Sequence, residues 1–83
     1  MTKTIIYTMG EDLKAAQKQR ETLINFAKTK KLEVVGYFSD TDKNKKSLNN
    51  ALALLDTLEK GQLLVTRTDN FSELQNKYKF ITP

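Results

Sequence analysis

Cysteine and histidine are both absent from this chain of 83 residues. Without cysteine, disulfides and thiolate chemistry are excluded, and the redox compartment cannot be read from the sequence. Without histidine, the chain lacks the commonest general base and metal ligand. A nucleophile would have to be a hydroxyl, a lysine or a carboxylate, and the sequence shows no paired base for any of the three serines, Ser39, Ser47 and Ser72.

Long apolar runs and glycine-rich loops are scarce as well. No run approaches the roughly 18 residues of a membrane span. The first three residues lead straight into a strand-like run with no signal-peptide pattern, so we expect a cytoplasmic protein. The three glycines, Gly10, Gly36 and Gly61, lie far apart, which excludes the GxxxxGK[ST] and GxGxxG phosphate loops. We therefore expect no cofactor.

Positive charge is present in moderate excess, with a formal net charge of +4. Apart from Arg20 and Arg67, every cation is a lysine, and lysine-rich surfaces usually serve solubility. The aromatic residues are spaced as core residues and not as a platform for stacking bases. The charge permits only weak, sequence-independent contact with nucleic acid, for which the candidate residues are Lys43, Lys45, Lys46 and Arg67.

The order of apolar patterns predicts an α/β protein. Runs of β-branched and apolar residues predict strands, and apolar residues at three- and four-residue steps predict helices. The predicted order is strand 4–8, helix 12–30, strand 32–38, a helix from Ser47 to about Leu58, strand 63–65, a short helix from Phe71 and a last strand near 78–81. This alternation predicts one domain, residues 1–83, folded as a three-layer sandwich around a small, mostly parallel sheet.

Single residues give further local predictions. Gly36 inside a strand indicates a bulge or a close backbone approach. Ser47 is predicted to cap the second helix, and Gly61 to follow that helix in the left-handed conformation. The segment 39–46 has no apolar residue and is expected to be a mobile loop.

The segment Gly61–Leu74 is the one around which the chain is organised. It contains a buried strand that ends in a polar turn and leads into a helix pattern. Ligands of open α/β sheets bind beyond the carboxyl ends of such strands, here at Arg67, Thr68, Asp69 and Asn70. The simpler alternative is that Asp69 or Asn70 only caps the next helix.

Several segments, in order and at fitting separations, carry a family resemblance. They are Tyr7 at the end of the first strand, Gln19–Leu23 in the first helix, Tyr37–Asp40 at the end of the second strand, and Leu58–Asp69. Over roughly residues 4–74 the chain resembles the N-terminal catalytic domain of serine recombinases, the resolvase/invertase group. The resemblance implies the fold of that domain, with Tyr7, Asp40 and Asp69 as retained site residues.

The chain departs from the family pattern at the positions of the residues that catalyse the reaction. Glu11 stands at the position of the nucleophilic serine, four residues after Tyr7, and the arginine positions hold Met9, Asn49, Asn70 and Glu73. Recombinases of this family attack a phosphodiester with the serine, and arginines stabilise the charge of the transition state. Loss of one such donor typically costs about 2.7–4 kcal/mol, and here all are replaced together.

The resemblance and its departures predict a resolvase-like domain that is not an enzyme. We expect it to be encoded by a mobile genetic element and to act through contacts with a protein, either a recombinase or a second copy of itself. One alternative is the weak nucleic-acid-binding module. The other is a new enzyme with Mg²⁺ at Asp40 and Asp69, but two acids distant in sequence are weak evidence for a metal site.

The fold implied by the resemblance also makes a geometric prediction. The strand 63–66 should lie inside the sheet beside the strand 4–7. Asp40 and Asp69 should then come near Tyr7, because parallel strands end at the same edge of a sheet.

Overall fold

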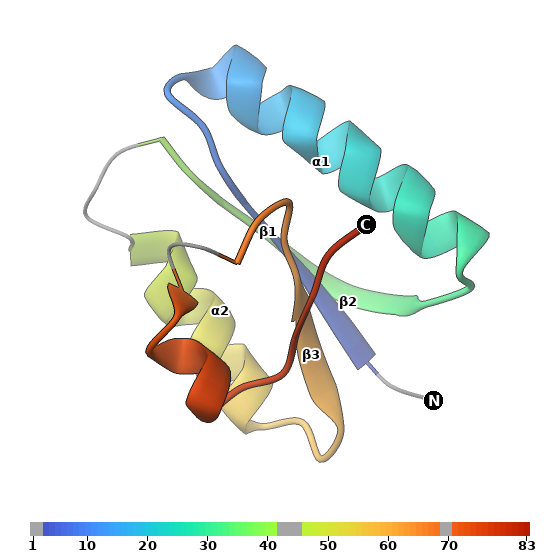
Figure 1. Cartoon of the computed structure of the whole chain (residues 1–83), viewed down its shortest axis with the longest axis vertical. Coiled ribbons are helices and arrows are strands. Elements are labelled where there is room, and N and C mark those ends of the chain that lie inside the picture. Colours follow the sequence, from blue (N-terminus) through green and yellow to red (C-terminus); the bar gives the residue numbers. More distant parts are fainter. Residues whose placement is uncertain (1–2, 42–45, 69–70) are drawn as a thin grey trace.

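The computed structural model describes residues 3–41, 46–68 and 71–83, and these form a three-layer α/β sandwich. The elements follow in the order β1 (Lys3–Met9), α1 (Leu13–Thr29), β2 (Glu33–Asp40), α2 (Lys46–Asp56), β3 (Gly61–Leu64), η2 (Leu74–Asn76) and β4 (Phe80–Ile81). In the described residues the sheet has four strands in the order β2-β1-β3-β4, and every neighbouring pair is parallel. Helix α1 covers one face and α2 the other (Figure 1), which confirms the predicted fold.

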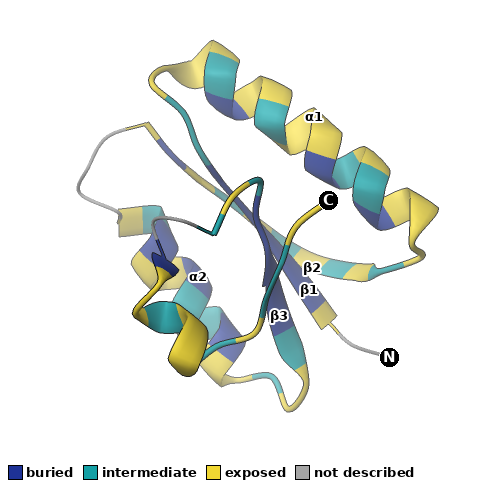
Figure 2. Cartoon of the chain, in the orientation of Figure 1, coloured by how far each residue is buried: buried dark blue, intermediate teal, exposed yellow. Residues whose placement is uncertain are grey.

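Strand β1 forms the centre of the fold. Its residues Thr4 to Thr8 are at most 1% exposed, because helices cover both faces and strands flank both sides (Figure 2). Strand β3 pairs with it from Lys3 opposite Gly61 to Ile6 opposite Leu64. The prediction that these two strands are neighbours inside the sheet is therefore confirmed, although β3 ends at Leu64 and not at residue 66.

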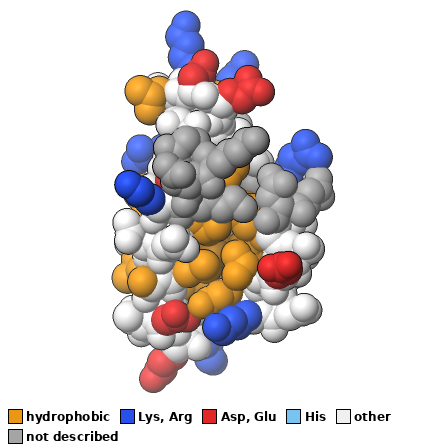
Figure 3. Space-filling model, turned by 90° about the vertical axis from the view of Figure 1, so that its left-hand side faces the viewer, with side chains coloured by type: hydrophobic (Ala, Val, Ile, Leu, Met, Phe, Trp, Pro, Cys, Tyr) orange, Lys and Arg blue, Asp and Glu red, His pale blue; other side chains and the backbone are white. Residues whose placement is uncertain are grey.

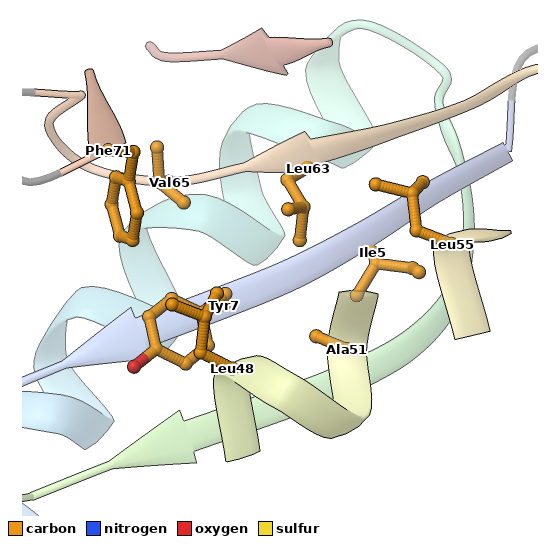
Figure 4. Close-up of a cluster of buried hydrophobic side chains, with 8 residues drawn as sticks. All are labelled: Ile5, Tyr7, Leu48, Ala51, Leu55, Leu63, Val65 and Phe71. Carbon is orange, nitrogen blue, oxygen red and sulfur yellow. The ribbon is translucent and has the colours of Figure 1, made fainter. Parts of the chain in front are cut away.

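Two apolar clusters hold the layers together. The cluster between the sheet and α2 comprises Ile5, Tyr7, Leu48, Ala51, Leu55, Leu63, Val65 and Phe71 (Figure 4). The cluster on the α1 face comprises Ile6, Leu23, Ala27 and Leu64. Burying each large aliphatic side chain contributes about 1.5–3 kcal/mol, so these clusters are the main source of the fold's stability.

Strand β2 is an edge strand with a bulge. Thr4 pairs with Val34 and Ile5 with Gly36, so Val35 has no partner in β1. The bulge predicted from Gly36 is thus confirmed. The strand also continues through Ser39 and Asp40. This agrees with the family resemblance, which places Asp40 at the end of the strand, and it corrects the loop predicted over residues 39–46.

The extension of β2 has a physical cause in its partners on β1. The Thr8 and Ser39 hydroxyl oxygens lie 2.6 Å apart and share a hydrogen bond, and the amide of Gly10 donates to the carbonyl of Asp40. The remaining residues 42–45 of the predicted loop lie outside the described residues.

Gly61, the first residue of β3, has a different role from the one predicted. Helix α2 already ends at Asp56, Gly61 is the first residue of β3, and no described glycine has a positive φ. A Cβ atom at Gly61 would collide with the side chain of Leu55. The prediction of a left-handed residue is wrong, and close packing of α2 on the strand accounts for the glycine.

A residue just beyond the end of helix α1 does adopt the left-handed conformation. Lys31 has φ 56°, its amide donates to the carbonyl of Lys28 at 3.2 Å, and the amide of Leu32 donates to the carbonyl of Ala27 at 2.9 Å. These two bonds form a Schellman motif, in which the left-handed position is usually glycine.

Lys31→Gly is therefore expected to raise the free energy of unfolding by about 0.5–1 kcal/mol. The left-handed conformation costs a side-chain-bearing residue about 1–2 kcal/mol, and the greater freedom of glycine in the unfolded chain offsets part of that gain. Urea denaturation measures the change. The matched control is Lys30→Gly, because Lys30 has a right-handed conformation and should lose stability. An equal loss in both variants would contradict the assignment.

None of the helices in the part of the chain that the structure describes is long and apolar enough to cross a membrane.

Candidate functional site

The carboxyl ends of β1 and β3 border a hollow of about 360 Å³. Here the connections of the sheet change face: α1 crosses one face of the sheet and α2 crosses the other. Such switch points are the usual ligand sites of open α/β sheets. We refer to it as the switch-point hollow, and it is lined by Tyr7, Met9, Gln19, Val65, Thr66, Arg67 and Phe71. It lies at the edge that the sequence analysis singled out.

Tyr7 and Asp40 form a direct hydrogen bond beside the switch-point hollow. The Tyr7 hydroxyl donates to Asp40 Oδ2 at 2.7 Å, and Asp40 is only 7% exposed. The Tyr7 ring belongs to the apolar cluster, while its oxygen lies at the edge of that cluster (Figure 4). The predicted proximity of Asp40 to Tyr7 is confirmed, and Asp69 lies outside the described residues.

The Asp40 carboxylate also caps helix α2 from the end of the neighbouring strand. Its Oδ1 accepts from the amide of Ser47 at 3.0 Å, and its Oδ2 accepts from the amide of Leu48 at 3.1 Å. The prediction that Ser47 is the cap is wrong, because Ser47 lies inside the helix, where its amide is one of the groups that need an acceptor.

Two opposing effects set the pKa of Asp40. Burial alone would raise the pKa, because it disfavours the charged form. The hydrogen bonds from the Tyr7 hydroxyl and from the amides of Ser47 and Leu48 outweigh burial and hold the pKa below its ordinary value. Asp40 is therefore held as a carboxylate, and its hydrogen bonds connect the end of β2 to Tyr7 in β1 and to the first amides of α2.

Gln19 joins the end of β1 to helix α1. The Met9 amide donates to Gln19 Oε1 at 3.3 Å, and Gln19 Nε2 donates to the Met9 carbonyl at 2.8 Å. In the sequence, Gln19 stands out only as part of the family resemblance, which assigns it no role. In this chain the Gln19 side chain forms hydrogen bonds with the backbone of Met9. Met9 itself stands at one of the positions where the family has an arginine.

The other predicted site residues are distributed around this edge. Glu11 is exposed in the connection between β1 and α1. Asn49 and Glu73 line a second hollow, of about 410 Å³, between α2 and residues 71–74, where apolar side chains gather on the surface (Figure 3). Phe71 lines both hollows, and Asn70 lies outside the described residues.

The predicted basic residues are only partly described. Lys46 is exposed at the first residue of α2, and Arg67 is exposed at the rim of the switch-point hollow. Lys43 and Lys45 lie outside the described residues. Their arrangement as a nucleic-acid-binding surface stays a prediction.

A metal site at Asp40 is not supported by its surroundings. Both carboxylate oxygens already accept hydrogen bonds from protein donors. Within residues 3–41, 46–68 and 71–83, no group of three or more acidic residues is placed to hold a metal ion. A donor set of hydroxyl and amide hydrogens stabilises a carboxylate and not a cation.

Comparison with known proteins relates the fold to a recombinase. No family model matches the sequence, and no curated protein matches it. A similar solved structure is the C-terminal catalytic domain of ISC1926 TnpA, an IS607-like serine recombinase, with a TM-score of 0.76 and 19% identity over 98% of this chain and 68% of that one. At this identity the likeness establishes the serine recombinase fold.

Proposed function

We propose that this chain is a resolvase-like domain that does not cleave DNA and acts by contact with another protein, in the setting of a mobile genetic element. The observation that carries the proposal is the division of the site into two parts. Tyr7 and Asp40 match the family pattern: the Tyr7 hydroxyl donates to Asp40, and Asp40 accepts from the amides at the start of α2. The position that matches the nucleophilic serine holds Glu11, whose side chain is exposed.

The chemistry of phosphoryl transfer supports this proposal. Cleavage needs a nucleophile and cationic donors placed around the non-bridging oxygens of the phosphate. The residues at the matching positions are a carboxylate at Glu11, a thioether at Met9, an amide at Asn49 and a second carboxylate at Glu73. The two carboxylates repel a phosphate, and the neutral groups do not replace the charge of the arginines.

Neither the wild-type protein nor Glu11→Ser is expected to form a covalent adduct with DNA. A restored hydroxyl still faces an unstabilised transition state, and the loss of even one donor typically slows such reactions about 10²–10³-fold. Supercoiled DNA from the native element is incubated with each protein, and nicked DNA and DNA bound covalently to protein are measured. Glu11→Gln is the matched control, because it removes the same charge without adding a nucleophile.

Two results would contradict the non-catalytic proposal. An adduct with the wild-type protein would mean that another residue has become the nucleophile. An adduct with Glu11→Ser but not with Glu11→Gln would mean that the missing arginines matter less than the chemistry above requires.

The partner that we propose first is a full-length recombinase of the same element. The support for it is the fold, because a chain with the recombinase fold and no cleavage chemistry can occupy the surfaces that recombinase subunits present to each other. Adding the purified domain to a recombination assay with that recombinase should change its rate. An unchanged rate at a large excess of the domain would contradict this partner.

A further inference from the structure

The outer edge of β2 is open. In the described residues, β1 is the only strand that pairs with β2, whose eight residues form one edge of the sheet. The strand at the opposite edge, β4, has two residues. A long open strand presents backbone N–H and C=O groups with which a strand of another chain can pair.

Exposed apolar side chains concentrate on this same strand. Among the described residues, three large hydrophobic side chains are exposed, and two of them, Val35 at 38% and Tyr37 at 46%, belong to β2. The guanidinium carbon of Arg20 lies 4.7 Å from the centre of the Tyr37 ring, which fixes that ring against α1. The edge therefore offers both free backbone groups and an apolar surface held in place.

We infer that β2 pairs antiparallel with β2 of a second copy of this chain, so that the two sheets join into one. Strand β4 of a second copy is too short to satisfy an edge of eight residues. Two identical strands related by a twofold axis meet antiparallel, which makes β2 its own partner. The inference names one partner for the proposed role in protein contacts and rests on that proposal in this respect.

The sequence of β2 is compatible with itself in this arrangement. When the pairing is centred on Gly36, Val35 lies opposite Tyr37 of the second copy, and Glu33 lies opposite Ser39. Pairs of aromatic and β-branched residues across strands are favourable, whereas like charges opposite each other are not, and this register contains none. In this register Gly36, the smallest residue of the strand, stands at the axis.

The surface is tested by the oligomeric state of three proteins. Sedimentation equilibrium over a concentration series should show a monomer–dimer equilibrium for the wild type. Val35→Lys should weaken the dimer about tenfold or more, because it places a charge in both of the Val35–Tyr37 pairs that flank the axis. Leu13→Lys is the matched control, since Leu13, at 78%, is the third of the large exposed hydrophobic residues in the described part of the chain and belongs to α1. Circular dichroism verifies that all three proteins are folded.

The register is tested by cross-linking, which the absence of native cysteine makes specific. A mixture of Val35→Cys and Tyr37→Cys proteins should form disulfide-linked dimers on mild oxidation more readily than either protein alone. The two positions lie directly opposite each other, at a Cα separation of about 4.5–5.5 Å that suits a disulfide. Equal yields from the mixture and the separate proteins would contradict this register and with it the self-pairing of β2.

Other outcomes would also overturn the inference. A wild-type protein that stays monomeric over the whole concentration series shows that this edge does not pair with itself. A dimer that Val35→Lys leaves unchanged, or that Leu13→Lys weakens equally, assigns the contact to another surface. None of these results bears on DNA cleavage. The proposed lack of catalysis is tested separately, by the assay for covalent adducts with DNA.

Discussion

Asp40→Ala is expected to lower the free energy of unfolding by about 3 kcal/mol. The substitution removes the cap of α2, which is worth about 0.5–2 kcal/mol, and it leaves the buried Tyr7 hydroxyl without this acceptor, at about 1–3 kcal/mol. The two effects act on one network and are measured together by urea denaturation. For a domain of this size such a loss is a large share of the total stability.

The control for Asp40→Ala is Tyr7→Phe, which deletes the 2.7 Å hydrogen bond to Asp40 but keeps the ring in the apolar cluster. It should cost less than Asp40→Ala, because the amides of Ser47 and Leu48 keep their acceptor. If Asp40→Ala costs no more than Tyr7→Phe, the capping role assigned to Asp40 is wrong.

The pH dependence of the same residue gives a second measure of this prediction. The pKa of Asp40 is lowered in the folded state from its ordinary value of 3.8, so the unfolded chain binds the proton more tightly. The stability that the carboxylate contributes is present above pH 3.8 and is lost as the pH falls through the folded-state pKa. The stability advantage of the wild type over Asp40→Asn should therefore narrow below pH 3.8.

Phe71→Ala is expected to destabilise the domain by about 3–5 kcal/mol, the usual cost of truncating a buried phenylalanine. Phe71 is 5% exposed, its ring meets the Tyr7 ring edge-on at 6.0 Å, and it stacks on the Phe80 ring at 5.1 Å. It thus ties the last strand to the centre of the sheet. Thermal and urea denaturation measure the loss of stability.

Hydrogen exchange separates this role from a general loss of packing. The amides of Leu63 and Val65 donate to the carbonyls of Lys79 and Ile81, at 2.9 and 3.0 Å, and these bonds hold the C-terminal strand. Phe71→Ala should speed their exchange more than that of the amides in β1. The matched control is Phe26→Ala, which truncates a half-buried phenylalanine on the opposite face. This variant should not speed the exchange of these two amides more than that of the amides in β1. Equal effects of the two variants would contradict the assignment.

The candidate site was only partly predictable from the sequence. Tyr7 and Asp40 were identified by a pattern of residues at the ends of two strands, and the parallel sheet brings those ends together. Ser47 was assigned the cap because a serine before an apolar stripe commonly has that role. The actual cap is a carboxylate seven residues earlier in the chain, and nothing in the local pattern of the helix shows which distant acceptor reaches its amides. Gln19 was missed for the same reason, because its partner is the backbone of a strand ten residues away.

The sequence by itself determined the order of the elements and the three-layer architecture, because the period of the apolar residues reports which face of each element avoids water. The tertiary structure alone decided which side chains serve each helix end, where β2 ends and why residue 61 is glycine. These depend on contacts between segments far apart in the chain, such as Asp40 with α2 and Gly61 with Leu55. Periodicity records the environment of a residue but not the identity of its neighbour, so such contacts become visible only once the layers are packed.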